Sequence, residues 1–197
     1  MRRTQQERSD STRAALVSAA RVLFATRGYH DVPAEEITRT AGVTRGALYH
    51  HFGDKQGLFR AVVEEVEIEL TAEVAAVMTS GTDPLTGMTT ALGVFLDACL
   101  REEVQRISLT DAPAVLGWDV WREIEGEHGL GLLVTSLSRA HAEGLIVDAP
   151  IRTLAQLILS AVMEAARMIA AADDPTAVRA ETQTVLAGWL GGLLRKN

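Results

Sequence analysis

The stretch from Thr38 to Phe52 constrains this chain more than any other part of its sequence. It predicts two short helices joined by a tight turn, because Gly42 supplies backbone freedom that other residues lack and the Thr44 hydroxyl can cap the second helix. Leu48 and Phe52, four residues apart, predict the buried side of that second helix. The outward side then carries Arg45, Gly46, Ala47, Tyr49 and His50. A helix-turn-helix with such an outward face suits DNA.

The net charge of -7 is unevenly distributed along the 197 residues. Residues 1–60 hold ten Lys or Arg against six Asp or Glu, and residues 61–197 hold nine against twenty, which gives net charges of +4 and -11. A basic N-terminal part can neutralise DNA phosphates, while an acidic remainder keeps the other surface away from DNA and maintains solubility. The distribution therefore favours DNA binding by the N-terminal part.

The start of the chain is polar and charged and has no apolar signal segment, and no apolar run has the length of a membrane span. The single cysteine, Cys99, excludes an internal disulfide. It fits a reducing compartment, although a plain buried side chain is the favoured explanation of this residue. We expect a cytoplasmic protein with no membrane partner.

Helical periodicity and capping residues divide the N-terminal part further. The first helix ends at Gly28, a second begins near Pro33, and Asp54 caps a fourth helix that runs to about Met78. The first eight or so residues form either a flexible basic arm on DNA or a solvated end of the chain. Four arginines that precede or open the first helix could belong to this arm: Arg2, Arg3, Arg8 and Arg13.

A set of residues in fixed register runs through this region: Gly28-Tyr29, Ile37, Ala41-Gly42-Val43-Thr44, Leu48-Tyr49-His50-His51-Phe52, Lys55 and Leu58. Over residues 10–60 this pattern resembles the N-terminal signature of the TetR family of bacterial transcriptional regulators. The chain departs from the signature at Val32-Pro33-Ala34, where the family usually has a Thr or Ser that caps the second helix and contacts a phosphate. A backbone amide at the helix start could replace that contact.

The candidate DNA-contacting residues are Thr44, Arg45, Gly46, Ala47, Tyr49, His50, His51 and Lys55. Arg45 is the candidate for reading a base, because its planar guanidinium suits guanine in the major groove, and Ala47 could touch a thymine methyl group. The resemblance implies that Tyr49, His51 and Lys55 contact phosphates. Packing against the first helix is the alternative for Tyr49, and a capping or core hydrogen bond is the alternative for His51.

Asp and Pro pairs punctuate the rest of the chain. Those at Asp83-Pro84, Asp148-Ala149-Pro150 and Asp173-Asp174-Pro175 open helices, and Asp111-Ala112-Pro113 interrupts one. No alternation typical of strands stands out. We predict an all-α chain with an N-terminal three-helix helix-turn-helix DNA-binding domain at residues 1–57. A helical effector-binding and dimerisation domain follows at residues 58–197.

Two helices of the second domain are apolar around most of their circumference. In the helix from Ile151 to Ala172 the polar residues fall within an arc of about 120°. One core does not account for so wide an apolar face, so we expect a four-helix homodimer interface, which the resemblance also implies. A larger monomeric core is the alternative. The candidate interface residues are Leu157, Ala161, Ala165, Leu186, Trp189, Leu190 and Leu193.

The resemblance also implies a small-molecule effector held in the second domain. The residues that could line its cavity are Met88, Phe95, Trp118, Trp121, His128, Met163 and Arg167, with core packing as the alternative for each. No nucleophile with a base, catalytic carboxylate pair, phosphate loop or metal-ligand spacing stands out. We therefore expect no enzyme activity, no cofactor and no metal.

The expected function is that of a ligand-responsive transcriptional regulator. Such a regulator, most often a repressor, binds a pseudo-palindromic double-stranded DNA operator as a dimer and is released by a small molecule. Two alternatives come from other classes of protein. One is a helical protein-interaction module, and the other is a small-molecule enzyme without sequence-specific DNA binding.

Overall fold

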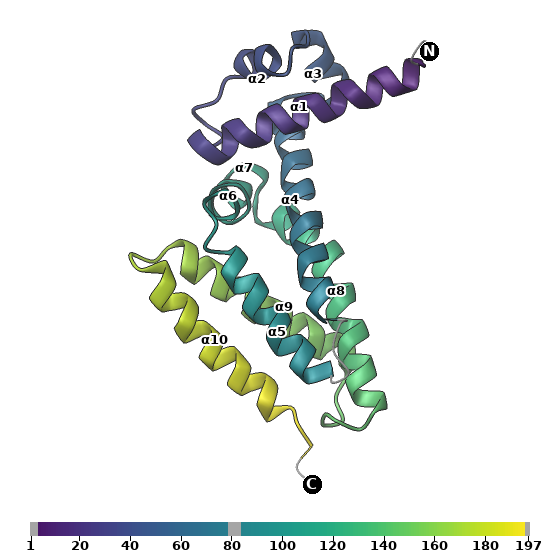
Figure 1. The fold of residues 1–197 in the computed structure, drawn as a ribbon, viewed down its shortest axis with the longest axis vertical. Coiled ribbons are helices and arrows are strands. Elements are labelled where there is room, and N and C mark those ends of the chain that lie inside the picture. Colours follow the sequence, from purple (N-terminus) through teal and green to yellow (C-terminus); the bar gives the residue numbers. More distant parts are fainter. Residues whose placement is uncertain (1–3, 79–83, 196–197) are drawn as a thin grey trace. The chain divides into compact units, whose positions relative to one another are not determined.

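The structure is a computed structural model that describes residues 4–78 and 84–195. These residues contain helices and no strand, which confirms the all-α prediction; Ile146 and Leu194 form an isolated antiparallel bridge. Figure 1 labels the helices. They are α1 (Gln5–Arg27), α2 (Ala34–Thr40), α3 (Arg45–Phe52), α4 (Lys55–Met78), α5 (Pro84–Ala98), α6 (Glu102–Val104), the π-helical segment η1 (Gln105–Asp111), α7 (Ala112–Leu116), α8 (Trp118–Ala142), α9 (Ile151–Ala170) and α10 (Pro175–Gly192).

Local capping sets several of these boundaries as the sequence predicted. Gly42 has φ +68° in the turn between α2 and α3, where a side chain would be strained. The Thr44 hydroxyl accepts a hydrogen bond from the Ala47 amide at 3.3 Å, and Asp54 Oδ1 accepts one from the Gly57 amide at 2.7 Å. Both caps satisfy amides that have no partner within their helix.

Two predictions about helix boundaries were wrong. Helix α1 already begins at Gln5, because Thr4 and Glu7 form a reciprocal capping box, so Arg8 and Arg13 lie in a helix and not in a flexible arm. Arg2 and Arg3 lie outside the described residues, as does Asp83. Asp111 does not interrupt a helix, because η1 runs directly into α7 and Pro113 occupies the first turn, where its missing amide is not needed.

The chain divides into two compact units, and the first comprises Met1–Val66 and Glu102–Trp121. Helices α1, α2 and α3 pack against one another within it (Figure 1). The largest fully buried side chains that they and the start of α4 contribute are Leu16, Phe24, Ile37, Leu48, Leu58 and Phe59. The sequence predicted a single domain boundary between residues 57 and 58. The first unit instead also includes residues 58–66 and the distant segment 102–121.

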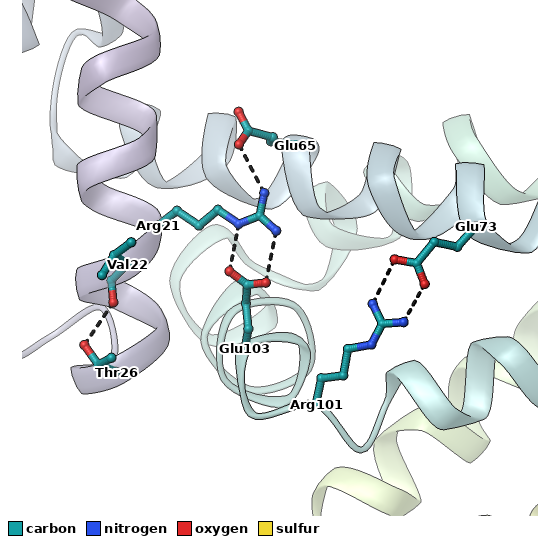
Figure 2. A network of polar contacts seen from close by, with 7 residues as sticks. All are labelled: Arg21, Val22, Thr26, Glu65, Glu73, Arg101 and Glu103. Carbon is teal, nitrogen blue, oxygen red and sulfur yellow. Dashed lines mark hydrogen bonds and ion pairs between the residues drawn. The ribbon is translucent and has the colours of Figure 1, made fainter.

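Long-range polar contacts attach that distant segment to the helix-turn-helix region (Figure 2). Arg21 of α1 lies between two carboxylates: its Nε is 2.7 Å from Glu103 Oε1, and its Nη1 is 3.2 Å from Glu65 Oε1. The backbone amide of Tyr29 donates to Asp111 Oδ2 at 2.7 Å. Arg21 and Glu103 are 82 residues apart in the sequence, and so are Tyr29 and Asp111. No local pattern in the sequence therefore predicts these contacts.

The second unit comprises Glu67–Arg101 and Arg122–Asn197. In it α9 packs against α10 and α5, and α10 also packs against α5. Arg179 of α10 joins α5 through an ion pair with Asp97 at 2.8 Å. Nη1 and Nη2 of Arg101 donate to Oε1 and Oε2 of Glu73, as Figure 2 shows.

Helix α9 is long and apolar enough to cross a membrane by length and composition alone, which the sequence analysis did not anticipate. Core helices of soluble proteins meet the same criterion. Here Ala155, Ala166 and Ile169 are fully buried against neighbouring helices, but only 28% of the most apolar stretch is buried. Much of the apolar surface of α9 is therefore left uncovered by this chain.

Candidate DNA-binding surface and ligand cavity

Helix α3 presents a polar face because its other side is fixed in the core of the first unit. Leu48 is fully buried, and the half-buried ring of Phe52 lies under the guanidinium of Arg13, whose Cζ is 5.3 Å from the ring centroid. The predicted DNA-contacting residues then divide by exposure. Thr44, Arg45, Gly46, Tyr49 and His50 are exposed, whereas Ala47, His51 and Lys55 are half-buried.

Arg45 lies on the exposed face but is held by two partners. Its Nη1 is 2.7 Å from Glu35 Oε1, and its Nη2 donates to the hydroxyl of Tyr49 at 3.1 Å. The guanidinium also lies over the Tyr49 ring, 5.4 Å from the centroid. The hydrogen bond to Tyr49, together with the charges of Tyr49 and Glu35, raises the pKa of Arg45. Glu35 was not among the predicted site residues, because a carboxylate in the first turn of α2 is already explained by the helix dipole.

Lys55 occupies a different place from the one expected of a phosphate contact. Its Nζ donates to the backbone carbonyls of Tyr29 at 2.8 Å and Val32 at 3.0 Å, and it lies 3.9 Å from the Tyr29 ring centroid. Partial burial lowers the pKa of Lys55. Burial and the nearby Asp54 carboxylate raise the pKa of Tyr29. Lys55 thus ties the start of α4 to the loop between α1 and α2.

The remaining contacts of this surface agree with close approach to a ligand. A methyl group added at Gly46 would meet only the Thr44 hydroxyl, at 3.9 Å, so the space in front of α3 is open. The rings of His50 and His51 lie with their centroids 5.2 Å apart. Pro33 is the N-cap residue of α2 and supplies no side-chain hydrogen bond, in agreement with the departure noted at Val32-Pro33-Ala34.

A cavity of about 260 Å³ lies within the second unit, between residues of α4, α5, α8, α9 and α10. Of the residues predicted to line an effector cavity, Met88, Phe95 and Met163 do so. Most of the other lining side chains are aliphatic, and Trp189 adds a second aromatic ring. Such a site suits a molecule with a large apolar surface.

Four predicted cavity residues do not line it: Trp118, Trp121, His128 and Arg167. Trp121 is buried in the first unit, where its Nε1 donates to the Ser108 carbonyl at 2.9 Å, and Trp118 lies against it with ring centroids 4.8 Å apart. Arg167 is exposed and paired with Glu164 of its own helix at 2.9 Å. Aromatic or basic character does not identify a cavity residue when several cores and surfaces can hold it.

Two buried carboxyl groups that the sequence analysis did not single out line the cavity. Glu67 of α4 and Glu125 of α8 are 8% and 6% exposed. Glu125 Oε1 has no hydrogen-bond partner within the described part of the chain. Burial, and secondarily the charge of Glu67, raise the pKa of Glu125 to about 9, although Arg122 acts in the opposite direction. A glutamate in a helix is usually a solvated residue, so its sequence position carries no signal of this role.

The residues predicted for the dimer interface also divide. Ala165, Leu186 and Leu190 are buried within this chain, because they face neighbouring helices of the same unit. Leu157 and Trp189 are each 64% exposed, and Ala161 and Leu193 are half-buried. The other large exposed apolar side chains of this region are Met168, Val185 and Leu194.

The helix-turn-helix of the first unit and the helical cavity of the second define a class, the helix-turn-helix transcriptional regulators with a separate helical regulatory part. Residues 16–62 match the family model described as bacterial regulatory proteins, tetR family. Residues 85–193 match the model for the C-terminal domain of tetracycline-repressor-like proteins. The chain belongs to the TetR family. It is a ligand-responsive DNA-binding transcriptional regulator of a family whose members are mostly repressors.

Individual relatives agree with this assignment. The Tn10 TetC protein of Escherichia coli is 32% identical over 138 residues, which cover 68% of each chain. The transcriptional repressor BepR of Brucella suis is 44% identical over 63 residues, about a third of each chain. A TetR-family transcriptional regulator from Pectobacterium atrosepticum has a solved structure that is 37% identical, covers 98% of this chain and 99% of its own, and superposes with a TM-score of 0.88.

Proposed function

We propose that this chain is a dimeric repressor that binds a pseudo-palindromic operator in the cytoplasm and is released when a small molecule enters the cavity of the second unit. The observation that carries the proposal is the polar exposed face of α3. Buried Leu48 fixes the opposite side of this helix in the core, and exposed Arg45 lies at its start. Helix α3 has only eight residues, so it presents few base contacts. Two copies at a fixed spacing are needed for a useful operator.

The uncovered apolar face of α9 and α10 supports the dimer. Leu157, Ala161 and Met168 recur at helical spacing along α9, and Val185 and Trp189 are four residues apart on α10. Gly188 lies next to Trp189 on the exposed side, and a methyl group added there would meet nothing within 4 Å. A small residue of this kind lets a second helix approach closely. We propose that a second copy of the chain covers this face through the same two helices.

Release by a ligand requires a difference in affinity between two states. A molecule that bound the DNA-competent and DNA-incompetent forms equally well would shift nothing, so the effector must bind the incompetent form more tightly. The cavity supports such a role because it is apolar, is bordered by five helices and contains carboxyl groups that can orient a ligand. Helix α4 is continuous from Lys55 to Met78 and contributes residues to both units.

Selection of bound sequences from a random DNA pool tests the proposed binding to an operator. We expect an inverted repeat, two chains per duplex in sedimentation, and binding at least about a thousandfold tighter than to random DNA. A screen for compounds that release the selected DNA then tests the proposed binding of an effector in the cavity. Thr71 is half-buried and lines the cavity, so Thr71→Trp should abolish release without changing DNA affinity. Recovery of no consensus sequence would contradict the proposed operator binding. Release of DNA that Thr71→Trp leaves intact would contradict the proposed role of the cavity.

A further inference from the structure

The cavity combines an apolar lining with a buried carboxyl group that has an unused oxygen. Glu125 is 6% exposed, lines the cavity from α8, and its Oε1 has no hydrogen-bond partner among the residues that the structure describes. An unpaired buried polar atom destabilises a fold unless another group satisfies it. A ligand that reaches the cavity and carries a hydrogen-bond donor would supply that group.

The charge around this oxygen favours a cationic donor. Glu67 faces the same cavity from α4 and is also buried, so the two carboxyl groups oppose each other's ionisation. The Cys99 thiol lies near both and is itself held protonated, since burial and these carboxylates raise its pKa to about 12. The basic groups nearby are Arg122, which donates to Ser160 at 3.2 Å, and Arg101, which is paired with Glu73.

The apolar lining agrees with the same ligand. Phe95 and Trp189 offer aromatic faces, and Met78, Met88 and Met163 offer polarisable thioethers. Aromatic faces attract cations, and flexible methionines adapt to irregular apolar molecules. Neither feature favours an anion.

We infer that the effector of this regulator is a hydrophobic amine, bound as its ammonium ion, with Glu125 as its counter-ion in the cavity. The inference rests on the proposed function and narrows it to a chemical class. At neutral pH the Glu125 carboxyl gives up its proton to solvent when the ammonium binds, and the resulting carboxylate accepts a hydrogen bond from the N–H of the ligand. Binding therefore releases one proton per amine.

Three matched probes test the inference: phenylbutylamine, phenylbutanol and phenylbutanoate, which share their apolar part. Titration calorimetry of the full-length protein at pH 7 should show the amine binding about tenfold more tightly than the alcohol, and the carboxylate more weakly than either. Repeating the titration in buffers of different ionisation enthalpy should show release of about one proton for the amine and none for the alcohol. The amine should also release the selected operator DNA.

Variants assign the effect to one carboxyl group. Glu125→Gln should remove the preference for the amine and the proton release, whereas Glu125→Asp should retain part of both. The matched control is Glu127→Gln, because Glu127 is exposed on the same helix and should behave as the wild type. Circular dichroism and thermal unfolding establish that each variant is folded.

Equal affinities for amine and alcohol, or amine binding that Glu125→Gln leaves unchanged, would overturn the inference. If the alcohol binds as tightly as the amine and Thr71→Trp abolishes the binding of both, the cavity remains the effector site and only the cationic class fails. If no probe binds, the cationic class fails as well. Release of DNA by screened compounds in the Thr71→Trp protein would overturn the proposed effector cavity itself.

Discussion

Arg45 is already ordered by protein contacts in the absence of DNA. Glu35 and Tyr49 hold its guanidinium on the exposed face of α3, so less side-chain freedom is lost when it reaches a base. The same ion pair opposes binding, because Arg45 must exchange the Glu35 carboxylate for its DNA partner. Exposed ion pairs of this kind are weak, so giving up the contact with Glu35 costs little free energy.

Replacing Arg45 separates base reading from general attraction to DNA. Arg45→Ala should weaken binding to the preferred operator roughly tenfold to a hundredfold and relax discrimination at one position of each half-site, because the base contact is lost. The control is Arg39→Ala, since Arg39 is exposed at the end of α2 and carries the same charge. It should weaken binding to all sequences alike. The measurement is affinity against a panel of single-base operator variants, and full discrimination in Arg45→Ala would exclude base reading by this residue.

Lys55 illustrates a basic residue whose main partners lie inside the protein. Lys55→Met retains the aliphatic stem but removes two hydrogen bonds to the carbonyls of Tyr29 and Val32. We expect the free energy of unfolding to fall by about 1 kcal/mol, since the site is only half-buried and water can replace part of the loss. Chemical denaturation measures this change, with Arg39→Met as the exposed control that should leave the midpoint in place. An unchanged midpoint for Lys55→Met would argue against the structural role and return Lys55 to the phosphate contacts.

Glu125 should make the stability of the protein depend on pH. Its pKa is raised from 4.5 to about 9 in the folded state, so the folded protein holds a proton that the unfolded chain releases. This contribution to stability is fully present below about pH 4.5 and is lost as the pH rises towards 9. Between pH 6 and 8 the wild type should lose about 1 kcal/mol per pH unit relative to Glu125→Gln. Glu67 shares the titration, so the slope belongs to the pair.

Unfolding in urea at several pH values gives this difference directly. Glu127→Gln removes a glutamate from an exposed position of the same helix and should run parallel to the wild type. A wild type and Glu125→Gln whose stabilities run parallel between pH 6 and 8 would show that Glu125 is ionised in the folded protein.

At the scale of elements, the turn between α2 and α3 depends on a single backbone conformation. Gly42→Ala should lower the free energy of unfolding by about 1 to 2 kcal/mol, because φ +68° is unfavourable for a residue with a side chain, although the space around it is open. Gly46→Ala is the matched substitution within α3. It should raise stability by about 0.5 to 1 kcal/mol but weaken DNA binding, because it adds a methyl group to the face that approaches the operator. Thermal unfolding and operator titration separate the two effects, and a stabilised Gly42→Ala protein would contradict this account of the turn.

The sequence predicted those elements whose causes are local. The caps at Thr44 and Asp54 involve residues three apart, and the buried side of α3 follows from helical spacing, so both could be inferred from the sequence alone. The contacts that refine the site are distant in the chain. Lys55 reaches carbonyls 23 and 26 residues away, and Asp111 accepts from an amide 82 residues away. The sequence pattern shows that a residue such as Trp121 is buried, but not whether it lies in a core or lines a cavity. Only the packing of the helices distinguishes these two positions.

At the scale of the whole molecule, the uncovered face of α9 and α10 has to be covered for two copies of α3 to act together. Trp189→Asp places a charge on that face, where burial against a second chain would leave it without a partner. We expect the variant to sediment as a monomer at micromolar concentration and to bind the operator at least about a hundredfold more weakly, because it loses the second half-site.

The matched control is Trp118→Asp. Trp118 is also half-exposed, but it belongs to the first unit, so its replacement should leave the dimer intact. Trp189 lines the ligand cavity as well, which would confuse a measurement of ligand response but does not affect sedimentation without ligand. Val185→Asp removes this ambiguity, because Val185 is exposed on the same side of α10 and does not line the cavity. If both α10 variants remain dimeric while operator binding persists, the copies associate through a different surface, and the exposed apolar residues of α9 and α10 require another partner.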